Sequence, residues 1–148
     1  MPWDTLFSLA SSTAMLGWAI LILAPRRIAV LGLTVRHAIP LALSVLYTVL
    51  ILGHFAAAGG GYGSIAEVRA LFASDPVLLA GWTHYLAFDL LVGVLVADRM
   101  DRIGLHRLIQ APILALVFLF GPVGFLLALI AEGAMRALGS SHNSPQKA

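Results

Sequence analysis

The chain contains no cysteine among its 148 residues. This absence excludes disulfide bonds, thiolate metal sites, cysteine-bound iron–sulfur clusters and covalent attachment of c-type haem. Charged residues are also scarce, at 11% of the chain, whereas a typical soluble domain carries about 25%. Hydrophobic residues make up 60%, and the mean hydropathy is +0.95. The composition therefore indicates an integral membrane protein, and the length allows one small domain.

Lysine and arginine are absent from the long apolar stretches and occupy the short segments beside them. The net charge of +2 and the pI of about 9.5 would fit nucleic-acid binding only if these residues formed a patch. Instead, most of them lie in two short segments. Residues 26–36 contain Arg26, Arg27 and Arg36, and residues 99–107 contain Arg99, Arg102 and Arg107. The others are Arg69, Arg136 and Lys147. Cytoplasmic loops of membrane proteins carry such an excess, so we expect both termini on the non-cytoplasmic side and no nucleic-acid partner.

Four apolar stretches are long enough to cross a bilayer, which takes roughly 20 helical residues. They comprise residues 5–24, 38–58, 76–97 and 108–131. Between the second and third, Ser64-Ile65-Ala66-Glu67 has the capping-box pattern that starts a helix. This helix is too short to cross, and we expect it to be amphipathic and interfacial. The sequence thus predicts an all-α bundle of four transmembrane helices within residues 1–131 and a polar, flexible tail at 132–148.

Asp89, in the third apolar stretch, is the most informative side chain. An ionisable group at membrane depth is energetically costly, so we interpret it as part of a functional site. At a helical rise of 1.5 Å per residue, Asp89 lies about 19 Å below the outer surface, level with Tyr47 of the second stretch. Tyr85 falls on the same stripe of the helix as Asp89, whereas His84 lies roughly 140° away around the axis. Asp89 and His84 therefore do not share one face.

Other candidate residues are expected near this depth. Thr13 of the first stretch and Gly121-Pro122 of the fourth reach the level of Asp89, and the glycine–proline pair predicts a kink. His54 lies nearer the surface, at the level of Trp82. A structural role for Asp89, as a polar link between helices, stays open. No metal site is expected, because Asp89 is the only carboxylate inside a predicted span and stable sites need three or four ligands.

The segment GWTHYLAFDLLVG, from Gly81 to Gly93, resembles the abscisic-acid-deficient-type, or neoxanthin-synthase-like, membrane proteins of plants and bacteria. Its Gly-Trp-x-His-Tyr-x-x-Phe-Asp core carries the resemblance. Three further segments support it in family order: LFSLASSTAMLGWAILILAPR, GSIAEVRALFASDPVLLAGW and LFGPVGFLL. The resemblance implies a four-helix membrane protein, required in plants for the isomerisation of an epoxy-carotenoid into the allene neoxanthin. The chain lacks the chloroplast transit region of plant members, so we expect a bacterial or core-only member in the bacterial cytoplasmic membrane.

The implied chemistry can be assigned to candidate side chains. Opening an epoxide to an allenic alcohol needs an acid at the epoxide oxygen and a base for a carbon-bound proton, and it needs no redox cofactor. The candidate catalytic residues are Asp89, His84, Tyr85 and Tyr47. The candidate ligand-binding residues are Trp82, His54, Phe88, Trp18, Thr13 and Pro122. The expected partners are a carotenoid or other long apolar ligand and membrane lipid.

Two other functions stay open at this point. One is a non-catalytic carotenoid- or lipid-binding accessory subunit of a larger membrane complex, for example a photosynthetic one. The other is a small transporter or channel component, which would need to form a homo-oligomer. An enzyme should lose its product when Asp89 becomes Asn, whereas a scaffold should keep its function.

Overall fold

A computed structural model describes residues 2–142, and it describes the side chains of residues 2–137. These residues form helices and no strand, so the predicted all-α fold is confirmed. Three helical segments are long and apolar enough to cross a membrane. They run from Pro2 to Leu23, from Ala29 to Ala57 and from Asp75 to Arg102. The chain is thus a helical membrane protein, as the composition predicts.

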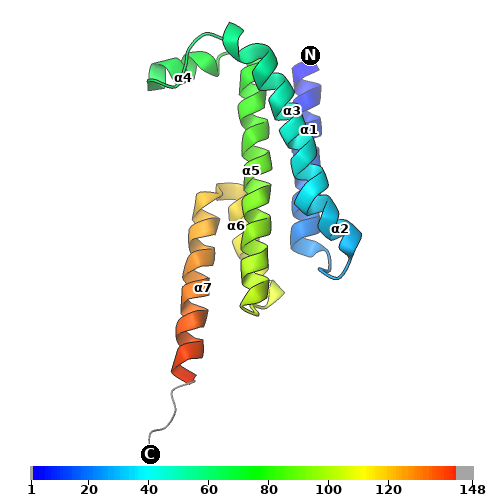
Figure 1. Cartoon of the computed structure of the whole chain (residues 1–148), viewed down its shortest axis with the longest axis vertical. Helices are drawn as coiled ribbons and strands as arrows, with labels where there is room; N and C mark the ends of the chain where they lie inside the picture. The colour runs from blue at the N-terminus through cyan, green and yellow to red at the C-terminus, as the bar shows by residue number, and fades with distance from the viewer. Residues whose placement is uncertain (1, 143–148) are drawn as a thin grey trace, which may run out of the picture.

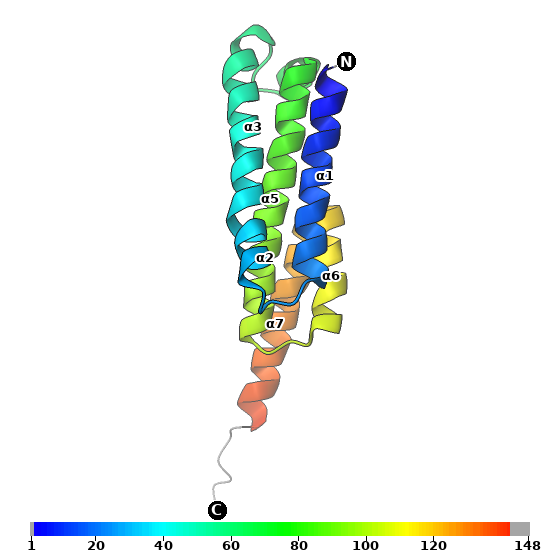
Figure 2. The same ribbon diagram turned by 90° about the vertical axis from the view of Figure 1, so that its right-hand side faces the viewer.

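Helix α5 (Asp75–Arg102) lies between α1 (Pro2–Leu23) and α3 (Ile39–His54) (Figures 1 and 2). The second membrane-crossing segment is composite. It begins with α2 (Ala29–Leu33), passes through the π-helical turn η1 (Thr34–Ala38) into α3, and ends in the 3-10 turn η2 (Phe55–Ala57).

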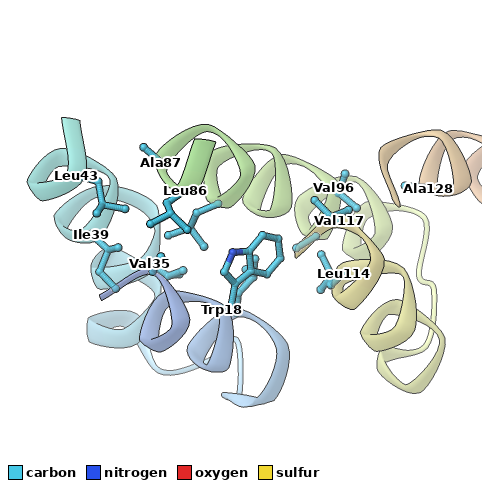
Figure 3. Close-up of a cluster of buried hydrophobic side chains, with 14 of the residues drawn as sticks. Trp18, Val35, Ile39, Leu43, Leu86, Ala87, Val96, Leu114, Val117 and Ala128 are labelled. Carbon is cyan, nitrogen blue, oxygen red and sulfur yellow. The ribbon is translucent and has the colours of Figure 1, made fainter. Parts of the chain in front are cut away.

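Close packing of α1 against α5 organises the core, with Trp18 at its centre (Figure 3). A Cβ added at Gly93 of α5 would overlap the ring of Trp18. In the reverse direction, a Cβ at Gly17 of α1 would lie 2.7 Å from Leu90 Cδ2. The missing side chains therefore let each helix seat a large residue of the other against its backbone.

The predicted fourth span is not one helix. The structure has α6 (Arg107–Phe120) and α7 (Pro122–His142), which fold back on each other as a hairpin (Figure 1). Pro122 cannot donate an i→i−4 hydrogen bond, so the break falls at Gly121. Gly124 then permits the close return, because a Cβ there would overlap the backbone of Leu116 and Val117. The Gly-Pro pair thus produces a reversal where the sequence predicts a kink, and within residues 2–142 three helical segments, not four, are long enough to cross a membrane.

The hairpin also changes where α7 ends. Helix α6 rises from the loop after α5 only to about half the height of the bundle, and α7 descends again (Figures 1 and 2). The start of α1 and the end of α7 consequently lie at opposite ends of the molecule (Figure 1). On which side of a membrane each terminus lies stays a prediction.

The short connecting helix starts as expected. Ser64 Oγ accepts a hydrogen bond from the Glu67 backbone N–H at 3.2 Å, and α4 spans Ile65–Leu71. It projects sideways from the end of the bundle where α5 begins (Figure 1), and its placement in a membrane interface stays a prediction. The predicted tail differs, because residues 132–142 continue α7 as helix. The rest of that tail, 143–148, lies outside the described residues.

Candidate functional site

Asp89 lies at the middle of α5 and faces the tip of the α6–α7 hairpin. A Cβ added at Gly121 would lie 2.8 Å from Asp89 Oδ1 and 3.1 Å from Oδ2, so only glycine lets the tip approach this closely. The Oδ2 atom is shielded from solvent and accepts no hydrogen bond from any described residue. Asp89 therefore faces protein neighbours at mid-helix, as the sequence predicts, and one of its oxygens lacks a donor.

Tyr85 connects the same site to the end of α6. Its hydroxyl donates to the carbonyl oxygen of Phe118 at 3.3 Å and lies close to the Asp89 carboxylate. Phe118 is in the last turn of α6, where carbonyl groups have no partner within the helix. Tyr85 thus holds the hairpin tip beside Asp89, and its 37% exposure leaves the ring accessible from outside.

Above the hairpin tip, the groove between α1 and α5 is lined by aromatic side chains. Trp82 Nε1 donates to Ser11 Oγ at 3.0 Å, and the Trp82 ring stacks on Phe7 at 5.4 Å between centroids. The rings of Trp82 and Tyr85 lie 5.3 Å apart. Because α6 stops at mid-height, none of the described helices covers this face of α1 and α5. We call this partly exposed surface the upper groove and define it by Phe7, Leu78, Trp82, Tyr85 and Asp89; the cavity on this surface lies at its upper part.

A cavity of about 390 Å³ opens at the top of the upper groove. Its lining residues come from the first turns of α1 and α5: Trp3, Asp4, Phe7, Asp75, Leu78, Leu79 and Trp82. Trp3 also meets His54 edge-to-face, with the ring centroids 5.5 Å apart. His54 therefore lies behind the cavity wall, at the end of α3, where its Nδ1 is 3.0 Å from the Leu50 carbonyl oxygen.

His84 and Tyr47 meet on the other side of α5. Their ring centroids are 5.4 Å apart, and the His84 ring stacks on Phe88 at 4.5 Å. Asp89 instead contacts the hairpin. The structure thus pairs Tyr85 with Asp89 and Tyr47 with His84, and it does not bring the two pairs together, as the angular separation of His84 and Asp89 predicts. Tyr47 is therefore level with His84 and not, as helical rise predicts, with Asp89.

The remaining predicted residues have different surroundings. Trp18 is buried in the core, where its ring meets that of Phe118 at 5.4 Å, so its place is among packing residues. Thr13 is half-buried on α1, and Pro122 is exposed at the start of α7. Among the described residues, no three or more His, Asp or Glu side chains are grouped so that they could hold a metal ion.

Sequence reasoning missed the α1 side of the upper groove. Phe7 and Ser11 are four residues apart, so they share one face of α1 and both reach Trp82. That spacing can be read from the sequence. The contact of both residues with Trp82 could not be predicted, because it depends on which face of α1 packs on α5.

These features define a class: an all-helical membrane protein with a carboxyl group at the middle of a long apolar helix, below a row of exposed aromatic side chains. The chain belongs to the ABA DEFICIENT 4-like family, whose model matches residues 5–127. The family predicted from the Gly81–Gly93 segment is therefore confirmed. No curated protein and no solved structure matches the chain.

Proposed function

We propose that this protein is a membrane-embedded carotenoid-modifying enzyme that isomerises an epoxy-carotenoid or a related polyene by acid–base chemistry. The observation that carries the proposal is the Asp89 carboxyl group, which is half-buried at the middle of α5 on the same stripe as the exposed rings of Trp82 and Tyr85. The family supports the substrate class, because the resemblance described above implies a role in neoxanthin formation.

The shape of the upper groove suits one end of a long apolar ligand. From Leu78 to Asp89 the stripe on α5 rises about 16 Å at 1.5 Å per residue. Trp82, Tyr85 and Leu78 are exposed along it, so a polyene in the lipid phase could lie against their apolar faces. The oxygenated end group would then reach Asp89 and Tyr85, while the rest of the ligand extends into the bilayer.

The reaction conserves atoms and electrons. A proton passes from the Asp89 carboxyl group to the epoxide oxygen as the carbon–oxygen bond breaks, and a proton leaves a neighbouring polyene carbon to complete the allene. The Asp89 carboxylate formed in the first transfer is a base within reach of the same end group, so it can accept the second proton and return to its starting state. Tyr85 positions that end group and the hairpin tip. His84 faces away and has no part in this proposal.

The test is expression in a bacterium that makes an epoxy-carotenoid, followed by analysis of extracted pigments. The wild-type chain should convert the epoxide to an allenic isomer, and Asp89→Asn should abolish conversion while the protein accumulates normally. Asp98→Asn is the control, because it makes the same chemical change on the same helix outside the upper groove. It weakens the ion pair with Arg36, so conversion is compared at equal amounts of folded protein, where it should match the wild type. Conversion by Asp89→Asn at the wild-type level would refute the proposal.

The alternative is a non-catalytic carotenoid- or lipid-binding accessory subunit. The observation that favours it is the openness of the upper groove, which shields a ligand only in part. In that case the purified chain should retain pigment of unchanged composition, and Asp89→Asn should alter the amount of bound pigment without altering its structure.

A further inference from the structure

A second cavity lies at the opposite end of the bundle, where the segment after α1 meets the π-helical turn η1. Its volume is about 110 Å³. One part of its lining is apolar and the other part is charged. The residues that matter here are Ile20, Leu31, Val35, Arg26, Arg36 and Asp101.

Arg26 is incompletely paired at this cavity. Its Nε donates to Asp101 Oδ2 and its Nη1 donates to the Leu21 carbonyl oxygen, both at 2.9 Å. The Nη2 atom is shielded from solvent and has no acceptor among the described residues. Asp101 cannot supply one readily, because its Oδ1 accepts from Gln110 Nε2 at 2.8 Å. Arg26 therefore lines the cavity and has one shielded donor atom without an acceptor among the described residues.

Arg36 provides a second guanidinium group from the π-helical turn, a conformation that is frequent at functional sites. It forms a two-point ion pair with Asp98. A guanidinium group has five N–H donors, and this pair occupies only part of them. Four more arginines lie at this end of the bundle: Arg27, Arg99, Arg102 and Arg107. Arg99 pairs with Glu132 at 3.5 Å. At this end, six arginines thus lie with three acidic side chains, Asp98, Asp101 and Glu132, and positive charge is in excess.

We propose that this cavity binds the phosphate group of an anionic membrane phospholipid. Guanidinium groups recognise phosphate oxygens through charge-assisted hydrogen bonds. The apolar lining argues for a lipid headgroup over free phosphate, because Ile20, Leu31 and Val35 can contact the glycerol and the first acyl carbons. The location of the cavity at the end of the bundle also supports a lipid headgroup, because basic pockets between the ends of transmembrane helices bind anionic headgroups.

The test uses a variant that narrows the cavity without removing either arginine. Gly32 lines the cavity, and a Cβ there would meet no atom within 4 Å, so Gly32→Leu should fit without a clash and narrow the cavity. Gly53→Leu is the matched control, because Gly53 is also helical and open but lies far from this end. Unchanged thermal unfolding of both variants would show that they fold.

Binding is measured on delipidated protein in detergent by native mass spectrometry, with phosphatidylglycerol, phosphatidylcholine and sodium phosphate as separate probes. The wild type should bind one phosphatidylglycerol about tenfold more tightly than phosphatidylcholine, as expected for a charged hydrogen bond. Gly32→Leu should lose this preference, and Gly53→Leu and the exposed-charge variant Arg27→Gln should keep it. Equal binding to both lipids, an unaffected Gly32→Leu, or an equal loss in Arg27→Gln would overturn the proposal. Binding of sodium phosphate that displaces the lipid fully would overturn the lipid assignment.

Discussion

At the scale of single residues, the site depends on one acid and one glycine from distant parts of the chain. Asp89 could be recognised in the sequence because a carboxylate within an apolar helix is costly unless it has a function or a partner. Helical rise alone also predicted that Asp89 and Gly121-Pro122 lie at the same height along the bundle. The contact between them could not be predicted, because it requires the reversal at Gly121 that directs α7 away from the groove.

The first prediction concerns Gly121. Gly121→Ala should move the hairpin tip away from Asp89 and lower the unfolding free energy by about 1–3 kcal/mol, as overpacking of a closely packed contact does. Thermal unfolding in detergent measures the effect. Gly133→Ala, at an open position of α7, is the control and should keep or slightly raise stability, because alanine favours a helix.

A double-variant cycle shows whether the effect acts through the carboxyl group. In the Asp89→Ala background, Gly121→Ala should cost markedly less, because the atoms that its Cβ would approach are gone. Equal costs in the two backgrounds would show that Gly121 and Asp89 are not in contact.

At the scale of elements, apolar periodicity and length correctly predicted α1, α3 and α5, and the Ser64 cap located the start of α4. The prediction of a single helix was wrong for residues 108–131, where the apolar stretch is continuous but the helix is interrupted at Gly121. Hydropathy reports only the medium that surrounds a segment, and a hairpin of two half-length helices is as apolar as one full helix. Three residues distinguish the hairpin from a single helix. Pro122 lacks an N–H donor, and Gly121 and Gly124 lack side chains that would block the close contacts of the hairpin.

The second prediction concerns the α1–α5 contact. Gly93→Ala should destabilise the protein by about 1–3 kcal/mol, because the added Cβ would overlap the ring of Trp18 and separate the two helices. Gly53→Ala provides the comparison in α3, where the position is open and alanine favours the helix. Chemical unfolding in mixed micelles measures both. Equal stability of the two variants would contradict the packing described for Trp18.

At the scale of the whole molecule, the half-height hairpin produces the asymmetry on which function depends. It fills the groove between α1 and α5 at the end with the basic loops and leaves the other end open, with Asp89 at the boundary. A fourth helix of full length would have covered Trp82 and Tyr85. The open groove could not be predicted from the sequence, because it depends on this topology.

The third prediction tests the topology directly, and the absence of cysteine makes the chain suitable for single-cysteine labelling. In sealed vesicles, Ala137→Cys and Arg102→Cys should react with a membrane-impermeant maleimide from the same side, and Pro2→Cys from the opposite side. This follows because α7 returns to the end at which α5 finishes. Labelling of Ala137→Cys from the side of Pro2→Cys would show that residues 108–131 cross the membrane after all.

The central claim is that Asp89 meets the oxygenated end group of a polyene in the upper groove. It is tested most directly by the affinity of the purified protein for an epoxy-carotenoid relative to a hydrocarbon carotenoid of the same length. The wild type should prefer the oxygenated ligand about tenfold, the size expected for a hydrogen bond to a carboxyl group, and Asp89→Ala should bind both alike. Equal affinities in the wild type, or a preference that persists in Asp89→Ala, would contradict the claim.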